Sequence, residues 1–307
     1  MPYDLIEPLV IGISSRALFD LEEENKLYEE EGISAYEEYQ LEHEKDILRP
    51  GSAFQLVKSF LELNNISDNR HLVEVIIMSR NSPNTSLRIF NSVKEYGLDI
   101  TRAALTSGAE MTPYLNAFKT NLFLSANEND VKGAINKGIA AGMILPGTPV
   151  STSEEAQSQI RIAFDGDAVL FNASSERIYQ QQGMAAFMEN EAINADVPMQ
   201  EGPFAKFLKA IAHIQGMFQD REQSPIRTAL VTSRNAPAHE RAIKTLRKWG
   251  VHVDEAFFLG GVEKKDILAA FGAHIFFDDQ RTHTDPASTL VPSAVVPYRD
   301  GDDPTQF

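Results

Sequence analysis

Cysteine is absent from this chain of 307 residues. Without thiols, the protein can form no disulfide bond, no thiolate metal site and no cysteine nucleophile. The seven histidines are scattered, and no His-Glu-x-x-His pattern occurs, so a zinc site is not expected. The chain also lacks the Gly-x-Ser-x-Gly, Walker A and Gly-x-Gly-x-x-Gly signatures, which argues against the enzyme classes that depend on them.

Basic residues are scarce relative to acidic ones. The chain carries 28 lysines and arginines against 44 aspartates and glutamates, a formal net charge of −16. Such a surface repels nucleic-acid phosphates and anionic membranes, so neither is expected as a partner. No stretch approaches the roughly 18 unbroken apolar residues of a membrane span, and residues 1–4 lack the basic start of a signal peptide. The sequence therefore predicts neither a signal peptide nor a membrane span, and the absence of cysteine suits a cytoplasmic protein.

Short apolar runs alternate with helical patterns, which is typical of an α/β protein with a parallel sheet. Helices are predicted over about 20–46 and over 87–96, the second ending at Gly97. Strands are predicted at residues 9–13, 73–78, 103–105, 122–124 and 160–164.

The chain divides in composition at residues 146–160, which are rich in Pro, Gly, Ser and Thr and are predicted to be a linker. The halves on either side, 1–145 and 161–307, are each predicted to be Rossmann-like. Their helical inserts, at about 20–70 and about 172–224, are expected to cover the mouth of a site.

The two halves repeat one plan. Ser-Arg-Asn-Ser-Pro at 79–83 returns as Ser-Arg-Asn-Ala-Pro at 233–237, and other blocks match at offsets of 151 to 154 residues. Agreement in several blocks at one offset favours a duplication. The alternative, that any two Rossmann-like halves look alike, stays open.

The second half carries a set of polar residues at the ends of apolar stretches. The set comprises Asp165 and Asp167, then Thr232, then Lys264, and finally Asp278 with Asp279. Opposite these positions the first half has Ser14, Arg16, Met78, Met111, Ser125 and Ala126. The second half is therefore predicted to be catalytic and the first to be degenerate.

This set suits phosphoryl transfer. Asp165 is the candidate nucleophile, because a carboxylate can attack phosphorus and form an aspartyl-phosphate. Asp167 could protonate the leaving alkoxide and later take a proton from water. The crowded carboxylates require a counter-cation, and oxygen ligands beside a phosphate favour Mg²⁺. Lys264 would add positive charge, and the Thr232 hydroxyl would hold a phosphate oxygen.

The four groups of residues resemble the motifs of the haloacid dehalogenase-like phosphatases. Within that superfamily, residues 13–20, 119–126 and 274–280 look like those of the cytosolic type I 5′-nucleotidases, and the similarity spans nearly the whole chain. The resemblance implies Mg²⁺-dependent hydrolysis of nucleoside 5′-monophosphates. It also implies a metal held by the Asp165 carboxylate, the Asp167 carbonyl and one of the two aspartates Asp278 and Asp279. We favour Asp279 as this ligand, with Asp278 in the outer shell near Lys264, and the choice between the two stays open.

The motifs say less about the substrate beyond its phosphate. Ser233, Arg234 and Asn235, directly after Thr232, are the predicted substrate contacts. Four aromatic residues of the second half could stack on a base but are more often core: Phe171, Tyr179, Phe187 and Phe204. Alternatives are a phosphatase of sugar phosphates or other small phosphoesters, and a nucleotide-binding regulator. A homo-oligomer is also left open.

Overall fold

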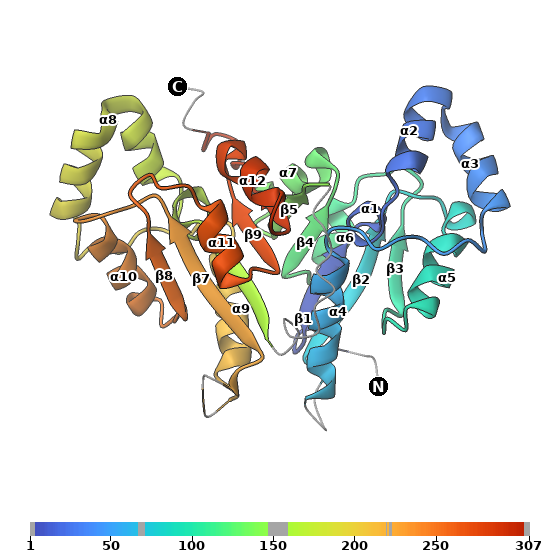
Figure 1. Ribbon diagram of the computed structural model, residues 1–307, viewed down its shortest axis with the longest axis horizontal. Helices are drawn as coiled ribbons and strands as arrows, with labels where there is room; N and C mark the ends of the chain where they lie inside the picture. The colour runs from blue at the N-terminus through green and yellow to red at the C-terminus, as the bar shows by residue number, and fades with distance from the viewer. Residues whose placement is uncertain (1–3, 67–70, 147–158, 219, 221–222, 304–307) are drawn as a thin grey trace.

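A single ten-stranded sheet runs through the molecule in the order β3-β2-β1-β4-β5-β10-β9-β6-β7-β8 (Figure 1). The computed structural model describes residues 4–66, 71–146, 159–218, 220 and 223–303. The strands are β1 (Leu9–Ile13), β2 (Val73–Ser79), β3 (Arg102–Leu105), β4 (Leu122–Ser125), β5 (Ala140–Ile144), β6 (Ile160–Phe164), β7 (Ile226–Thr232), β8 (Glu255–Phe258), β9 (Ile275–Asp278) and β10 (Ser293–Val295).

Helices cover this sheet and connect its strands. They are α1 (Ser15–Leu18), α2 (Glu22–Glu31), α3 (Ile33–Glu42), α4 (Phe54–Glu62), α5 (Leu87–Glu95), α6 (Thr112–Ala117), α7 (Glu128–Asn136), α8 (Ser174–Ile193), α9 (Ala205–Gln215), α10 (His239–Lys248), α11 (Lys265–Phe271) and α12 (Arg281–Ser288). The predicted α/β class, with a mostly parallel sheet, is confirmed. Among the described helices, none combines the length and the apolarity that crossing a bilayer requires.

The strand order reads as two groups of five that meet at β5 and β10. Within each group the pairs are parallel, and β5 and β10 pair antiparallel through Met143 with Val295 and Ile144 with Ala294. Apart from the edge strands β3 and β8, which are partly exposed, the strands are buried on both faces, which explains why they read as continuous apolar runs rather than as alternating ones. We call the β5–β10 pairing the central seam.

The helical structure predicted over about 20–46 is confirmed, and it is divided into two helices, α2 and α3. Gly32 separates them with φ +84° and ψ −175°. This backbone conformation is energetically unfavourable for any residue that has a side chain. In α8, Gly183 makes the same break with φ +81° and ψ 178°, 151 residues later. Figure 1 shows both broken helices on the same side of the molecule, at opposite flanks.

The two inserts contribute to the core as well as to this side of the molecule. Helix α4 buries Val57 and Phe60, and α9 buries Phe207 and Ile211, all within the main apolar cluster. Only part of each insert is therefore in a position to cover a site. The predicted linker falls mainly on residues outside the described ranges, and β6 begins at its last residue, Ile160.

Strand register corrects one pairing of the halves. Ile13 of β1 pairs with Ile77 of β2, and the equivalent Phe164 of β6 pairs with Leu230 of β7. Two residues further along each second strand, Ser79 rather than Met78 is therefore the equivalent of Thr232. Each hydroxyl oxygen accepts the backbone N–H two residues ahead, from Asn81 to Ser79 at 3.2 Å and from Arg234 to Thr232 at 3.3 Å. The matching Ser-Arg-Asn triplets are therefore one residue out of step in space.

A side chain at Gly142, in the central seam, should destabilise the fold. A Cβ atom there would lie 2.9 Å from Cβ of Ala294 and 3.0 Å from the Phe277 ring. We expect Gly142→Ala to lower the free energy of unfolding by about 1–3 kcal/mol, as overpacking does. Urea denaturation measures this change. Because Ala294 supplies the closest atom, Ala294→Gly in the same chain should recover part of the loss, and no recovery would contradict the steric explanation.

Candidate active site

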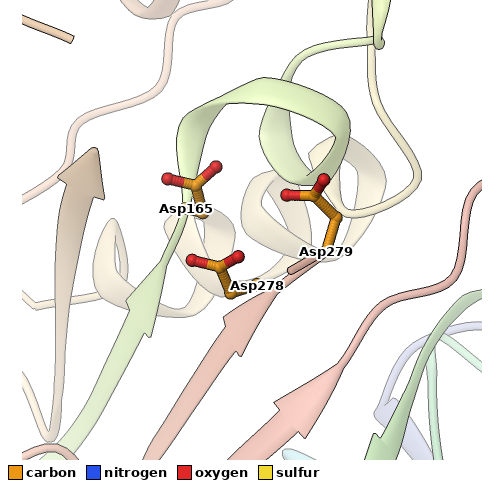
Figure 2. A group of neighbouring side chains, drawn as sticks. All are labelled: Asp165, Asp278 and Asp279. Atoms are coloured by element: carbon orange, nitrogen blue, oxygen red, sulfur yellow. The ribbon is translucent and has the colours of Figure 1, made fainter. Parts of the chain in front are cut away.

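Three carboxylates meet at the carboxyl ends of two neighbouring strands. Asp165 follows β6, while Asp278 ends β9 and Asp279 follows it. The strands are held in register there by a hydrogen bond from Asp165 N to the Phe277 carbonyl oxygen, at 2.8 Å. One oxygen from each carboxylate lies within 4.8 Å of the others (Figure 2). Asp165 and Asp278 are buried, so this is a dense cluster of charge away from water.

Lys264 inserts its ammonium group between two of these carboxylates. Its Nζ donates to Oδ1 of Asp165 and to Oδ2 of Asp278, both at 2.6 Å. Burial alone would lower the pKa of Lys264, but the two carboxylates raise it above its ordinary value. The adjacent Lys265 points elsewhere and pairs with Glu263 at 2.9 Å. The cation of the cluster is therefore Lys264.

The carboxylates differ in how well their charge is compensated. Burial, opposed by Lys264 and reinforced by Asp278, raises the pKa of Asp165 to about 7. Burial and the neighbouring Asp278 also raise the pKa of Asp279 well above its ordinary value. For Asp278, burial is outweighed by Lys264 and His283, so its pKa is lowered. Asp278 is thus the anchored anion. Asp165 shares Lys264 with it but remains harder to ionise because of its burial, and Asp279 has no cation beside it among the described residues.

Two contacts in this cluster were missed by the sequence interpretation. His283 places Nδ1 3.1 Å from Oδ2 of Asp278, and the Tyr298 hydroxyl donates to Asp279. His283 lies on α12, five residues after Asp278, and that short spacing was an available signal. Tyr298 carried no such signal, because only the chain's course after β10 brings it back to the site.

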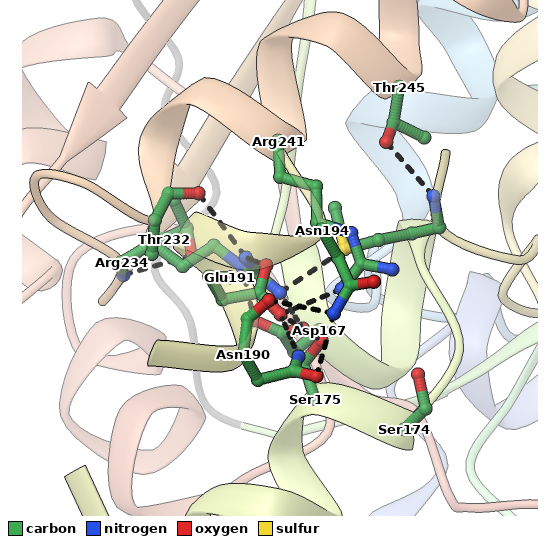
Figure 3. A network of polar contacts seen from close by, with 12 residues as sticks. Asp167, Ser174, Ser175, Asn190, Glu191, Asn194, Thr232, Arg234, Arg241 and Thr245 are labelled. Atoms are coloured by element: carbon green, nitrogen blue, oxygen red, sulfur yellow. Dashed lines mark hydrogen bonds and ion pairs between the residues drawn. The ribbon is translucent and has the colours of Figure 1, made fainter. Parts of the chain in front are cut away.

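Asp167 is held by a buried arginine rather than left open. Arg234 donates Nε to Oδ2 and Nη2 to Oδ1 of Asp167, both at 2.7 Å, and also forms an ion pair with Glu191 (Figure 3). The Arg234 side chain is only 1% exposed. The predicted substrate residue Arg234 therefore orients Asp167 in this arrangement. Glu191, from the insert, was not anticipated.

Thr232 completes the polar site from the end of β7, where it is buried. The chain passes very close to it, because a Cβ atom at Gly166 would lie 3.3 Å from the Thr232 hydroxyl oxygen. Ser233 and Asn235 follow on the surface and are exposed. These two predicted substrate contacts are thus accessible beside the cluster.

The four aromatic candidates separate by exposure. Phe171 and Phe204 are fully buried and Phe187 is 7% exposed, which favours the core interpretation for all three. Phe171 and Phe187 also pack against Arg234, at 5.9 and 5.2 Å from its guanidinium carbon. Tyr179, which is 39% exposed, is the member that a ligand could reach.

The donor set of the carboxylate cluster fits a hard divalent cation. It offers oxygen ligands only, with no sulfur or imidazole nitrogen among the three residues, which suits Mg²⁺ better than zinc or copper. The raised pKa values of Asp165 and Asp279 indicate charge that a cation would neutralise.

The chain matches known proteins over most of its length. The family model described as 5′-nucleotidase matches residues 1–303. The chain belongs to the 5′-nucleotidase family. Human cytosolic 5′-nucleotidase 1B is 39% identical over 291 residues, covering 92% of this chain and 47% of the human protein. The chain thus spans about half the length of this relative, and the resemblance to the cytosolic type I 5′-nucleotidases is confirmed.

Two solved structures show distant likenesses to this 5′-nucleotidase family member. A Pseudomonas aeruginosa structure assigned as a universal stress protein has a TM-score of 0.33 at 9% identity, covering 96% of this chain and 95% of its own. Histidinol dehydrogenase of Elizabethkingia anophelis has a TM-score of 0.23 at 10% identity, covering 92% of this chain and 52% of its own. Likenesses of this size carry no argument about the fold.

Replacing Asp165 by Asn should change how stability depends on pH. The pKa of Asp165 is about 7 in the folded protein and near 4 in an unfolded chain. The folded state therefore binds more protons between these values, and its stability falls as pH rises through that window. We expect the melting temperature of Asp165→Asn minus that of the wild type, both in EDTA, to rise from pH 5 to 7 and then level off.

Because only one proton is involved, the free energy of unfolding cannot change by more than about 1.4 kcal/mol per pH unit. Asp99→Asn, at an exposed position, supplies the baseline. A difference for Asp165→Asn that follows this baseline from pH 5 to 8 would show that Asp165 titrates as an ordinary aspartate.

Removing the Lys264 charge should destabilise the protein through the partners that remain. Lys264→Met leaves two buried carboxylates without a cation, which typically costs about 3–5 kcal/mol. Adding Asp165→Ser and Asp278→Ser to Lys264→Met should recover most of that loss in urea denaturation. A triple variant as unstable as the single one would contradict charge crowding as the cause, and Lys265→Met should change little.

Proposed function

We propose that this protein is a Mg²⁺-dependent 5′-nucleotidase of the haloacid dehalogenase-like type that hydrolyses nucleoside 5′-monophosphates in the cytoplasm. The observation that carries the proposal is the cluster of Asp165, Asp278 and Asp279 with Lys264 at the ends of adjacent strands. The substrate class and the location are supported by family membership and by the name of the human relative.

The proposed reaction proceeds in two displacements at phosphorus. A carboxylate oxygen of Asp165 attacks the phosphorus atom, the bond to O5′ breaks, and Asp167 gives its proton to the leaving O5′ oxygen. Water then attacks the aspartyl-phosphate, Asp167 takes a proton from it, and the bond between phosphorus and Asp165 breaks. The nucleoside and inorganic phosphate leave, and both side chains return to their starting states.

The Arg234 contact gives Asp167 a defined position for this role. Both oxygens of Asp167 are bound to Arg234, so proton transfer requires that one of these hydrogen bonds opens. Arg234 is itself held by Glu191, which restrains its movement. We infer that Arg234 is a positioning residue for Asp167 rather than a direct ligand of the substrate.

The Mg²⁺ ion would be held by the carboxylates of Asp165 and Asp279 and the carbonyl oxygen of Asp167. It would neutralise negative charge and orient the phosphate. Asp278 is less suited to direct coordination, because Lys264 and His283 already donate to it. This supports Asp279 as the inner ligand.

The remaining groups would bind the substrate on either side of the reacting phosphorus. Lys264 contacts Asp165, the Thr232 hydroxyl lies close to Gly166, and both would hold phosphate oxygens. Ser233 and Asn235 are exposed next to them, and Tyr179 offers an accessible ring for stacking on a base.

We also propose that the two halves arose by duplication and that the second half alone is catalytic. The mirrored strand order and the matching breaks in α2–α3 and α8 support this. So do two equivalent contacts, in which the Leu48 N–H donates to Ser92 Oγ at 3.0 Å and the Met199 N–H to Thr245 Oγ1 at 3.1 Å.

Phosphate release from nucleoside 5′-monophosphates and sugar phosphates, with Mg²⁺ and with EDTA, tests the function. We expect Mg²⁺-dependent release from the nucleotides. Asp165→Asn should fold and lose at least about a thousandfold in kcat, because it removes the nucleophile. Asp99→Asn should keep full activity, since it lies far from the cluster in the other half.

Each other outcome changes a different part of the proposal. Full activity in Asp165→Asn would refute the aspartyl-phosphate mechanism. Release mainly from sugar phosphates would keep the chemistry and replace the substrate class. An absence of release from any compound would leave the nucleotide-binding regulator as the better description.

A further inference from the structure

The first half contains a cavity of about 410 Å³ that the proposed reaction does not use. Its walls include the carboxyl ends of β1, β2 and β4, and α2 and α3 face them from the insert. Small-molecule sites in proteins are typically roughly 300–1,000 Å³. The size and the polar strand ends fit a small polar ligand.

The cavity takes the same place in the first half as the candidate active site in the second. Ser14 stands at the end of β1 where Asp165 follows β6, and Ser79 stands at the end of β2 where Thr232 ends β7. In open α/β sheets, ligands bind outside the carboxyl ends of the strands. Both halves therefore present the kind of edge at which this architecture binds ligands.

The chemistry of the two edges differs in charge. Ser125 and Ala126 replace the carboxylates of β9, so the first half needs no cation to accept an anion. Arg16 replaces Asp167 and brings a positive charge to the cavity wall. Its Nη2 donates to Glu22 at 3.1 Å, whereas its Nε is buried without a partner among the described residues.

The acidic side chains of the wall are mostly neutralised by their own partners. Glu24 pairs with Arg88 and Asp130 pairs with Arg80, both at 2.6 Å. Glu37, on α3, is the remaining acidic residue of the wall. An anionic group near Arg16 would thus be repelled less by the wall, because two of its three carboxylates are already paired with arginines.

The insert contributes an aromatic pair to the same cavity. Tyr28 and Tyr36, on either side of the break between α2 and α3, lie with ring centroids 6.0 Å apart and planes at 82°. Tyr179 and Phe187 repeat this pair in α8, at 6.3 Å and 76°. Tyr28 is 49% exposed, so its ring is accessible for stacking on a planar base.

We propose that this cavity binds a nucleoside 5′-monophosphate and does not hydrolyse it. The phosphate would lie against Ser14, Arg16 and Ser79, and the base against Tyr28. Hydrolysis is absent because no carboxylate stands where Asp165 attacks phosphorus. The choice of ligand class rests on the proposed function of the second half, whereas the presence of a polar ligand site rests on the cavity itself.

Hydrogen–deuterium exchange of the whole chain locates binding in each half independently of turnover. The probes are adenosine, guanosine, cytidine and uridine 5′-monophosphates in EDTA, with the nucleosides and inorganic phosphate as separate arms. We expect a monophosphate to slow exchange at 14–16, 79–82 and 125–127 in EDTA. Protection of 165–167 and 232–235 is expected only when Mg²⁺ is supplied, which is measured in Asp165→Asn so that the ligand is not hydrolysed. The nucleoside and phosphate arms show which part of the ligand supplies the affinity.

Two variants test the residues that would hold the ligand. Tyr28→Ala should weaken binding in the first half about tenfold, the typical effect of losing one stacking partner, and Arg16→Ala should weaken the monophosphate more than the nucleoside. Neither should alter protection in the second half. Tyr114→Ala and Arg49→Ala, exposed residues of the same half outside the cavity wall, are the matched controls.

The outcomes separate this proposal from the proposed function. Protection confined to 165–167 and 232–235 would overturn the second site and leave the nucleotidase intact. Protection in the first half, with no phosphate release in the activity assay, would support the site and refute the enzyme. First-half protection unchanged in both Tyr28→Ala and Arg16→Ala would overturn the assignment of the ligand to this cavity.

Discussion

The ion pairs of Lys264 with Asp165 and Asp278 are the interaction on which the second half depends. At an effective dielectric constant of about 20, two like charges 4 Å apart repel by about 4 kcal/mol, so these carboxylates could not be buried together without a cation. The Lys264 ammonium group compensates the charge of Asp165 and Asp278, whereas Asp279 accepts a hydrogen bond from the Tyr298 hydroxyl. The residue that lets this edge of the sheet fold is also the one that would bind a phosphate oxygen in the proposed reaction.

Much of the site could be predicted from the sequence because the carboxyl ends of parallel strands share one edge. Asp165, Thr232 and Asp278 each end or follow an apolar run, and their proximity follows from strand pairing. The contacts of Glu191 and Tyr298 could not be predicted in this way. They depend on how a helical insert and a returning segment pack, which no periodicity in the sequence records.

The comparison of the halves shows a similar limit. Sequence identity aligned the two Ser-Arg-Asn triplets, but hydrogen-bond register aligned Ser79 with Thr232. Register has physical priority, because shifting a strand by one residue turns every side chain to the other face. The helical stretch predicted over about 20–46 is present, but its division into α2 and α3 at Gly32 was not predicted.

The antiparallel seam between β5 and β10 has a consequence for how this protein can be handled. Although strand direction reverses there, Figure 1 shows the broken helices of both inserts on one side of the twisted sheet. The start of β1 lies at the opposite end of its strand from Ser14. A surface tether at the exposed Glu7, just before β1, would therefore leave both edges facing the solution.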